Sequence, residues 1–288
     1  MGHLSKISMA AVMAVGVAAA AAGCGTSSAS GASTLLQQVQ ATHTLTIAES
    51  SFAPQDFQNP ATKQWTGYDV NILEGFAHSL GAHLKIDALP FSSAIQAVAD
   101  QQADVTIDIY YTKSRAKVLS FSRPMLNYND AVAVNSQNPG VHQDTVSALK
   151  GQKIAVVTGS AEVPEAQAVP NADVKEYGSV AESFLALSAG RVAADFQPDT
   201  DIAWAKEKDP SLHIKILGPV PRSIAPPIQS LRGYFGVPKG SYSQTFLAKL
   251  NAYLKKIAEN GTEQKILDKY GMTSPVFLKG ISSAPNTP

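Results

Sequence analysis

The chain has 288 residues, enough for one large domain or two smaller ones, since most domains contain about 100–200 residues. Its hydrophobic content of 44% is ordinary for a globular protein and too low for a membrane protein with many spans. The 23 basic side chains balance the 23 acidic ones, and no run of basic residues offers the positive surface that nucleic-acid binding requires. We therefore exclude multi-span membrane proteins and nucleic-acid binders.

The first residues of the chain predict export from the cytoplasm. An apolar run of roughly 14 residues, from Met9 to Ala22, follows a short polar start that contains Lys6. This run is shorter than the roughly 20 residues that a membrane-spanning helix needs, and it is typical of the hydrophobic region of a signal peptide. The expected signal peptide covers residues 1–23.

Cys24, the only cysteine of the chain, directly follows this segment. It has no disulfide partner, and an exposed free thiol is a liability outside the cell. The sequence Ala21-Ala22-Gly23-Cys24 resembles a bacterial lipobox, which implies that Cys24 is diacylated and becomes the mature N-terminus. We expect a lipid anchor at Cys24 and a flexible tether of small and polar residues over 24–40. An ordinary signal peptide with an incidental cysteine is the alternative.

From residue 45 onward, short apolar strands alternate with amphipathic helices, which favours βαβ units and a mainly parallel sheet. Within 68–80, Val70, Leu73, Ala77 and Leu80 share one helical face. Strands are expected at 45–48, 84–89, 105–109 and 131–135, with helices at 68–80 and 93–101.

A second βαβ series follows the polar turn at 136–140. Ser179 and Glu182 have the spacing of a capping box, so a helix is expected to begin there. Strands are expected at 153–157, 193–197, 212–217 and 233–237, and helices at 161–168, 179–189, 199–208, 242–259 and 263–270. The tail after Lys279 is rich in Pro and Ser and is expected to be disordered.

Three short motifs occur in order along the chain. They are Thr66-Gly67-Tyr68-Asp69-Val70-Asn71, the segment from Thr112 to Pro124, and Gly190-Arg191-Val192. Together they resemble family 3, the amino-acid-binding branch of the type II periplasmic solute-binding proteins, over about residues 42–275.

The resemblance implies an α/β fold of two Rossmann-like lobes joined by a two-strand hinge near 132–135 and 233–237. Lobe 1 is expected to be discontinuous. The expected ranges are 41–133 and 234–279 for lobe 1, 134–233 for lobe 2, and 280–288 for the disordered tail.

The resemblance also implies a carboxylate site. In the family an arginine at the position of Arg115 binds the α-carboxylate of the ligand, a role that suits a planar, always-charged, bidentate donor. Gly159 and Ser160 match residues that bind the same carboxylate from lobe 2, at a helix start where free N–H groups attract anions. The alternatives are a surface arginine that caps a helix and a plain N-cap.

Four more residues are expected near the ligand. Phe52 and Phe91 match aromatic side chains that form the apolar walls of the family's pocket, and both are otherwise ordinary core candidates. Asp108 and Tyr110 stand where the family has small residues, so Tyr110 brings bulk into the pocket. Asp108 is a candidate acceptor for a ligand cation or a partner for Arg115.

The acceptor of the ligand's ammonium group is left open by the sequence. The acid that fills this role in the family falls on Pro198, with Asp199 one residue later and Asp195 three residues earlier. Glu49 lies near the position of the family's lobe-1 acid. The candidates are therefore Asp199, Asp108 and Glu49, and a quaternary ammonium or another zwitterion is an alternative to an α-amino acid.

The sequence contains no pattern that predicts catalysis. Its six histidines show no metal-ligand spacing, and it has no nucleophile elbow, P-loop or Cys-x-x-Cys motif. We expect no catalytic residue, no metal site and no cofactor. The fold hosts a few cleft enzymes such as cyclohexadienyl dehydratases, so a prephenate-type dehydratase is an alternative.

The expected function is that of a monomeric extracytoplasmic lipoprotein that binds a small polar zwitterion, an amino acid, and delivers it to the permease of an ABC importer. Contacts from both lobes would shift the population from open to closed when the ligand binds. A lipoprotein that senses a ligand for a membrane signalling partner is the alternative binding role.

Overall fold

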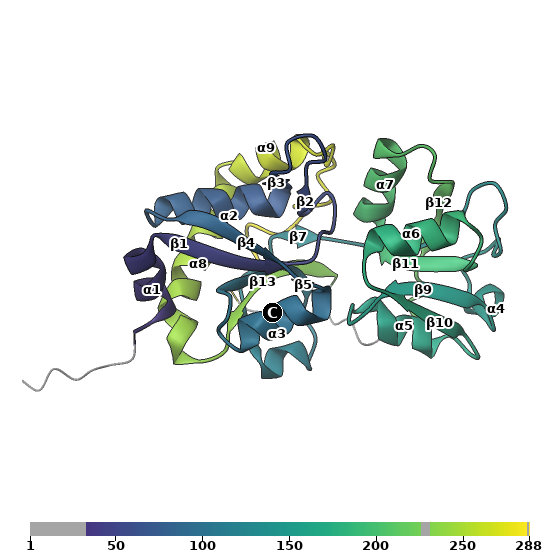
Figure 1. Ribbon diagram of the computed structural model, residues 1–288, viewed down its shortest axis with the longest axis horizontal. Coiled ribbons are helices and arrows are strands. Elements are labelled where there is room, and N and C mark those ends of the chain that lie inside the picture. Colours follow the sequence, from purple (N-terminus) through teal and green to yellow (C-terminus); the bar gives the residue numbers. More distant parts are fainter. Residues whose placement is uncertain (1–32, 226–230, 287) are drawn as a thin grey trace, which may run out of the picture. The chain divides into compact units, whose positions relative to one another are not determined.

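The computed structural model describes residues 33–225, 231–286 and 288 (Figure 1). The expected signal peptide, Cys24 and the first part of the expected tether lie outside the described residues. Residues Ser33–Pro288 form one compact unit, whose described part contains two large sheets and one two-stranded sheet. Over the described ranges, none of the helices combines the length and the apolar character that crossing a membrane requires.

The first lobe is built on a six-stranded sheet in the order β4-β1-β5-β13-β6, with β7 paired to β13. Strand β1 runs parallel to β4 and β5, whereas β13 runs antiparallel to β5, β6 and β7. The strands are β1 (Thr44–Glu49), β4 (His83–Ala88), β5 (Val105–Tyr110), β6 (Leu119–Phe121), β7 (Leu126–Asn127) and β13 (Arg232–Pro238). A separate hairpin pairs β2 (Phe57–Gln58) with β3 (Trp65–Thr66).

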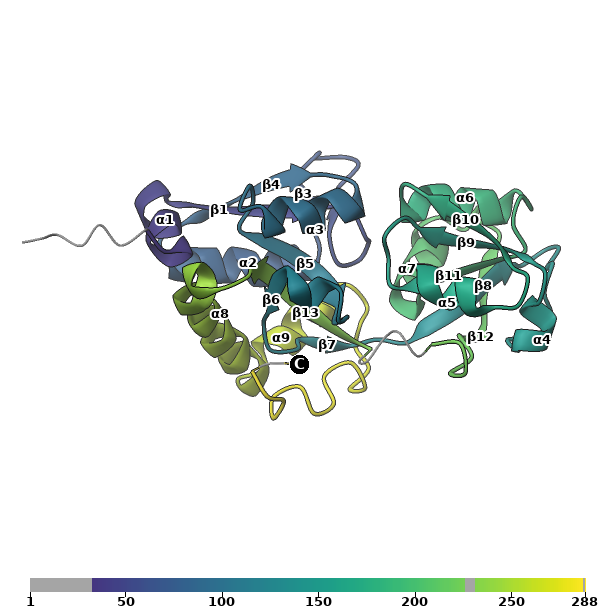
Figure 2. The same ribbon diagram turned by 90° about the horizontal axis from the view of Figure 1, so that it is seen from below.

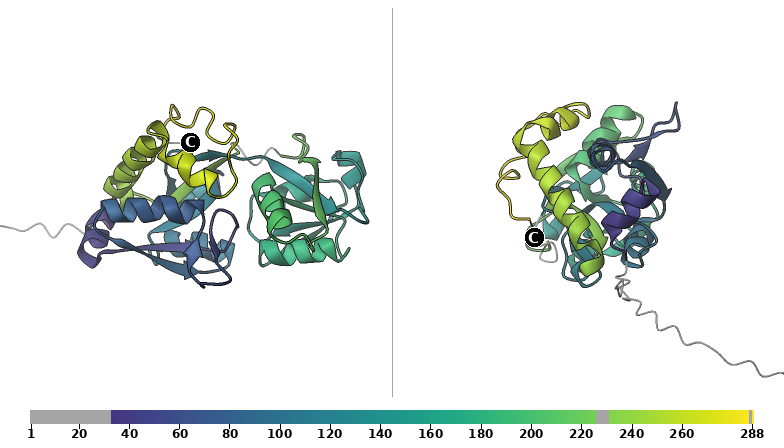
Figure 3. Two further views of the ribbon diagram at one scale, coloured as in Figure 1. Left: turned by 90° about the horizontal axis from the view of Figure 1, so that it is seen from above. Right: turned by 90° about the vertical axis from the view of Figure 1, so that its left-hand side faces the viewer.

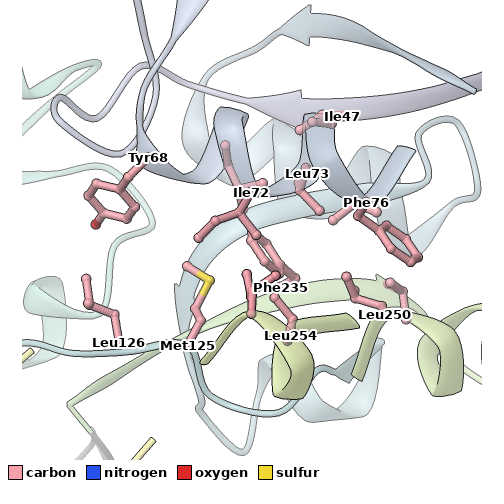
Figure 4. Packing of buried hydrophobic residues seen from close by; sticks show 14 of the residues in the cluster. Ile47, Tyr68, Ile72, Leu73, Phe76, Met125, Leu126, Phe235, Leu250 and Leu254 are labelled. Atoms are coloured by element: carbon pink, nitrogen blue, oxygen red, sulfur yellow. The ribbon is translucent and has the colours of Figure 1, made fainter. Parts of the chain in front are cut away.

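Helices of this lobe bury one apolar face each. On α2, Tyr68, Ile72 and Phe76 are almost fully buried and pack with residues of β13 and α8 (Figure 4). Burying a large apolar side chain stabilises the fold by about 1.5–3 kcal/mol, so this stripe fixes how α2 lies on the sheet. The helices are α1 (Leu35–Thr42), α2 (Tyr68–Ser79), α3 (Phe91–Ala99), α8 (Ser241–Glu259), α9 (Thr262–Asp268) and the 3-10 helix η1 (Arg115–Lys117).

The second lobe is built on a five-stranded sheet in the order β10-β9-β11-β8-β12. Strand β9 runs parallel to β10 and β11, and β8 runs antiparallel to β11 and β12; helices α5 and α6 both contact β9 (Figure 2). The strands are β8 (Asp130–Asn135), β9 (Lys153–Val157), β10 (Asp173–Tyr177), β11 (Ala194–Pro198) and β12 (Ile214–Pro219). The helices are α4 (Val146–Leu149), α5 (Glu162–Ala168), α6 (Val180–Ser188) and α7 (Asp199–Lys208).

The chain passes between the two sheets at different points from those expected. Strand β8 lies wholly in the second sheet and β13 wholly in the first, so the passages are residues 128–129 and the segment between β12 and β13. All six residues of β8 are buried, and they pair with β11 on one side and β12 on the other. This pairing places residues 130–133 in the second lobe.

Both ends of the described chain are more ordered than expected. Helix α1 begins inside the expected tether, because Thr34 and Gln37 form a capping box and Leu35 and Val39 are fully buried. At the other end, Ile281 is only 1% exposed. The C-terminus lies beside α8 (Figure 3), where Asn251 donates a hydrogen bond to the carbonyl oxygen of Asn286. Residues 280–286 therefore differ from the expected disordered tail.

Candidate ligand-binding site

A cavity of about 40 Å³ is lined by side chains from both lobes. The lining residues of the first lobe come from β5, η1, the start of α3 and the loop after β1. Those of the second lobe come from the segment between β9 and α5, the first residue of α5 and the end of β11, and Tyr128 lies in the passage between the lobes. The expected site residues that line it are Phe52, Phe91, Asp108, Tyr110, Arg115 and Ser160. The residues that line it without having been expected are Gln55, Asp56, Ile107, Tyr128, Ala161, Glu162 and Pro198.

Arg115, the first residue of η1, is the one basic side chain that lines this cavity among the described residues. Its Nη1 donates to the carbonyl oxygen of Tyr110 over 3.0 Å, and its Nη2 donates to the carbonyl oxygen of Gly159 over 3.2 Å. Burial lowers the pKa of Arg115 to about 10, and the charge of Glu162 opposes this fall. No ion pair to Arg115 occurs within the described ranges, so its positive charge is available to an anion.

Gly159 brings the second lobe close to the first. Its φ of +77° is in the left-handed region, and a Cβ at this position would lie 2.9 Å from the Cβ of Ser92 on α3. Only glycine adopts this φ and fits this close to Ser92 without strain. Gly159 does not line the cavity itself, but its carbonyl oxygen accepts the bond from Arg115.

Phe52 and Phe91 form one apolar wall. Their ring centres are 5.2 Å apart at an interplanar angle of 63°, an edge-to-face arrangement. The guanidinium carbon of Arg115 lies 5.2 Å from the ring centre of Phe91, within the range of a cation–π contact. The wall therefore also orients the guanidinium.

Asp108 on β5 is a buried acid of the first lobe that lines the cavity. Its Oδ2 accepts hydrogen bonds from the hydroxyls of Tyr68 and Tyr128, and the side chain of Gln55 also lies beside the carboxyl group. Burial raises the pKa of Asp108 to about 7. Its φ of +47° is uncommon for a residue with a side chain, and such strain is most often found at functional sites.

Tyr110 links the cavity to the second lobe. It is 6% exposed, and its hydroxyl donates to Oδ1 of Asp130 on β8 over 2.7 Å. Its backbone carbonyl also accepts a bond from Arg115. The tyrosine thus does more than add bulk, because it holds both the arginine and a buried acid of β8.

Ser160 and Glu162 lie together at the start of α5. Ser160 is 9% exposed, and its hydroxyl lies beside the carboxyl group of Glu162, whose pKa it lowers against the effect of burial. Glu162 is 4% exposed and is the first residue of the helix, whose first turn also contains Glu165. The expected anion-binding helix start therefore carries two acidic side chains. Sequence reasoning missed Glu162, although it stands only two residues after Ser160.

The other two expected ammonium acceptors do not line the cavity. Glu49 accepts a hydrogen bond from the backbone N–H of Ser51 through Oε2 over 2.6 Å. Asp199 begins α7, and its Oδ2 accepts a bond from Nδ2 of Asn129 over 3.3 Å. Of the three candidates, the structure brings only Asp108 to the cavity.

No group of three or more His, Cys, Asp or Glu side chains in the described ranges has an arrangement that suits a metal ion. The cavity instead combines one guanidinium, three carboxyl side chains, an apolar wall and the hydroxyl of Ser160. This arrangement suits the binding of a small charged molecule.

Comparisons with known proteins agree with this chemistry. The sequence model of the family described as "Bacterial extracellular solute-binding proteins, family 3" matches residues 45–273. The "Arginine-binding periplasmic protein" of Mannheimia haemolytica is 26% identical over 230 residues, which is 78% of this chain and 89% of that protein.

Solved structures share the fold. "An ancestral arginine-binding protein bound to arginine" is 25% identical with a TM-score of 0.70, and the match covers 79% of this chain and 98% of that one. "The ancestral amino acid-binding protein AncCDT-1, a precursor of cyclohexadienyl dehydratase" is 21% identical with a TM-score of 0.70, and the match covers 82% of this chain and 98% of that one. At 21% identity this second likeness is one of fold alone.

Proposed function

Because the chain belongs to the bacterial extracellular solute-binding proteins of family 3, we propose that it is the lipid-anchored binding component of an ABC importer for a cationic amino acid. The family match confirms the resemblance that the three motifs indicated, and the two sheets confirm the two-lobed α/β fold. Solute binding outside the cytoplasm follows from the family. The anchor, the importer and the cationic ligand are our proposal.

One observation carries the choice of ligand. Arg115 lines the cavity without an ion pair to any acid of the described residues, and the buried acid Asp108 lines the same cavity. A guanidinium binds a carboxylate through two parallel hydrogen bonds, and a buried acid favours a cation. The pair therefore suits a ligand with a negative and a positive end. The arginine-binding names of the relatives favour a cationic side chain.

Hinge closure follows from the size of the cavity. Small-molecule sites usually have volumes of about 300–1,000 Å³. The present cavity of about 40 Å³ is closed by contacts such as that of Arg115 with Gly159. The lobes must move apart before an amino acid enters, and the ligand then replaces contacts between the lobes by its own.

A binding screen tests the ligand. At 100 times its dissociation constant, a ligand raises the free energy of unfolding by about 2.7 kcal/mol, which a thermal-shift assay detects. We expect L-arginine and L-lysine to stabilise the protein, L-glutamate not to do so, and Arg115→Ala to abolish the effect. Arg191→Ala, which changes an exposed arginine, is the matched control. No shift with any amino acid or betaine, together with turnover of prephenate, would instead establish a dehydratase.

The lipid anchor and the importer need separate tests. Cys24→Ser should release the protein from the membrane fraction and prevent its labelling with palmitate, while leaving ligand binding unchanged. Cells that lack the chain should lose uptake of the labelled ligand. Unchanged uptake combined with loss of a transcriptional response to the ligand would favour the sensing role.

A further inference from the structure

The cavity contains more acid than a single ligand cation needs. Among the described residues, Asp56, Asp108 and Glu162 are the carboxyl side chains that line it. Both oxygens of Asp56 already accept hydrogen bonds, from the backbone N–H groups of Ser51 and Phe52 over 3.0 and 3.2 Å. Two acids, one from each lobe, are therefore left to meet positive groups of a ligand.

These two acids differ in their relation to Arg115. Glu162 is close enough for its charge to raise the pKa of Arg115, and the charge of Arg115 in turn lowers the pKa of Glu162 against the effect of burial. Asp108 is instead hydrogen-bonded by the hydroxyls of Tyr68 and Tyr128, and the side chain of Gln55 also lies beside it. Glu162 follows by three residues Gly159, whose carbonyl oxygen accepts a hydrogen bond from Nη2 of Arg115. These contacts put Glu162 at the arginine end of the cavity and Asp108 at the tyrosine end.

The covalent structure of an amino acid decides which acid meets which group. The α-carboxylate and the α-ammonium share one carbon atom, so the acceptor of the ammonium must lie beside the guanidinium that holds the carboxylate. We propose that Glu162 binds the α-ammonium group of the ligand, in place of an acid at the end of β11, where this chain has Pro198. Asp108 then receives the cation of the ligand's side chain. This assignment rests on the proposed function.

The charges of ligand and cavity then match one by one. The α-carboxylate meets Arg115, the α-ammonium meets Glu162, and the distal ammonium or guanidinium meets Asp108. The hydroxyl of Ser160, which lies beside the carboxyl group of Glu162, is an additional polar group at the α-carbon end. An acidic amino acid would place a second carboxylate against Asp108, and like charges repel in a site of low dielectric constant. The arrangement therefore selects cationic side chains.

Removing single charges from both protein and ligand tests the assignment. The ligands are L-arginine, 5-guanidinopentanoate, which lacks the α-ammonium group, and L-citrulline, which has an uncharged side chain of nearly the same shape. Dissociation constants are measured by calorimetry for the full chain in detergent and for Glu162→Gln, Asp108→Asn and Asp199→Asn. Circular dichroism confirms that each variant folds.

The wild type should bind L-arginine about 10- to 100-fold more tightly than either analogue, the usual range for one hydrogen bond to a charged group. Glu162→Gln should remove the preference for L-arginine over 5-guanidinopentanoate and keep the preference for L-arginine over L-citrulline. Asp108→Asn should do the reverse, and Asp199→Asn should change neither ratio.

Two results would overturn the assignment while leaving the proposed function intact. One is a Glu162→Gln variant that still discriminates against 5-guanidinopentanoate as the wild type does. The other is loss of this discrimination in Asp199→Asn alone. If none of the amino acids binds the wild type, the proposed function itself fails, which is a different outcome.

Discussion

Nε2 of Gln55 in the first lobe donates a hydrogen bond to Oδ1 of Asp201 in the second lobe over 2.7 Å. The two side chains are 2% and 1% exposed, so the bond is shielded from water. Three residues further along α7, the ring centre of Trp204 lies 5.4 Å from that of Phe57 and 6.1 Å from that of Tyr270. Side chains of α7 therefore hold the second lobe against the first beside the cavity.

We predict that Trp204→Ala shifts the protein without ligand toward the open form. Aromatic pairs contribute about 0.5–1.5 kcal/mol each beyond their buried area, so the loss of two pairs should change the open population by roughly tenfold. Small-angle X-ray scattering should show a larger radius of gyration, and stopped-flow measurements a faster association with the ligand. Leu185→Ala, which changes a leucine of α6 that is 60% exposed, should alter neither. Equal scattering curves for the wild type and Trp204→Ala would contradict the prediction.

The alternation of strands and helices could be predicted because most elements have a buried apolar face. Strand β10 was missed, since it is an edge strand whose five residues include three exposed ones and therefore lack an apolar pattern. The boundary between the lobes was placed a few residues too late. Strand β8 is apolar and buried throughout, and such a pattern does not tell to which of two sheets the strand belongs.

The site shows the same limit of sequence reasoning. Arg115, Phe52 and Phe91 were found because they stand in or near a local motif, and all three line the cavity. Gln55 was not found, because its importance arises from contact with a residue 146 positions away. An acid in the first turn of a helix, such as Glu162, normally needs no explanation beyond the helix dipole. Only the contact of Arg115 with Gly159, three residues before Glu162, brings this acid near the guanidinium.

We predict that Gly67→Ala is much more destabilising than Gly81→Ala. Both glycines have positive φ angles, +137° and +74°, so both substitutions strain the backbone. A Cβ at Gly67 would lie 2.0 Å from the carbonyl oxygen of Gln55, whereas a Cβ at Gly81 would have no atom within 4 Å. The free energy of unfolding in urea should fall by about 1–2 kcal/mol for Gly81→Ala and by clearly more for Gly67→Ala. Similar losses of unfolding free energy in the two variants would mean that the segment around Gln55 moves easily to make room for the added methyl group.

We predict that Asp195→Asn stabilises the protein more at pH 8 than at pH 5. Burial raises the pKa of Asp195 to about 7 from 3.8, and its Oδ2 has no partner in the described structure. Between these two values the folded state holds a proton that the unfolded state has released, so the free energy of unfolding falls as the pH rises through this window. One such group accounts for at most about 1.4 kcal/mol per pH unit.

Urea titrations of the wild type and Asp195→Asn from pH 5 to pH 8 check this. The difference in the free energy of unfolding between the two proteins should grow in favour of the variant as the pH rises. Asp209→Asn is a suitable control because Asp209 is exposed and hydrogen bonds from Ser211 lower its pKa. A difference between the wild type and Asp195→Asn that stays constant with pH would show that Asp195 does not titrate in this range.

We predict that Arg123→Ala releases the C-terminal segment. Arg123 is 1% exposed, and its Nη2 donates to the carbonyl oxygens of Ile281 and Ser282 over 2.8 Å each. Hydrogen bonds to a charged group contribute about 1.5–3 kcal/mol each, so their loss should let this segment open more often. Amides of 280–286 should exchange with deuterium much faster in Arg123→Ala than in Arg191→Ala. If these amides exchange equally fast in the wild type and in Arg123→Ala, the guanidinium does not hold this segment. The segment would then be disordered, as its Pro- and Ser-rich composition indicates.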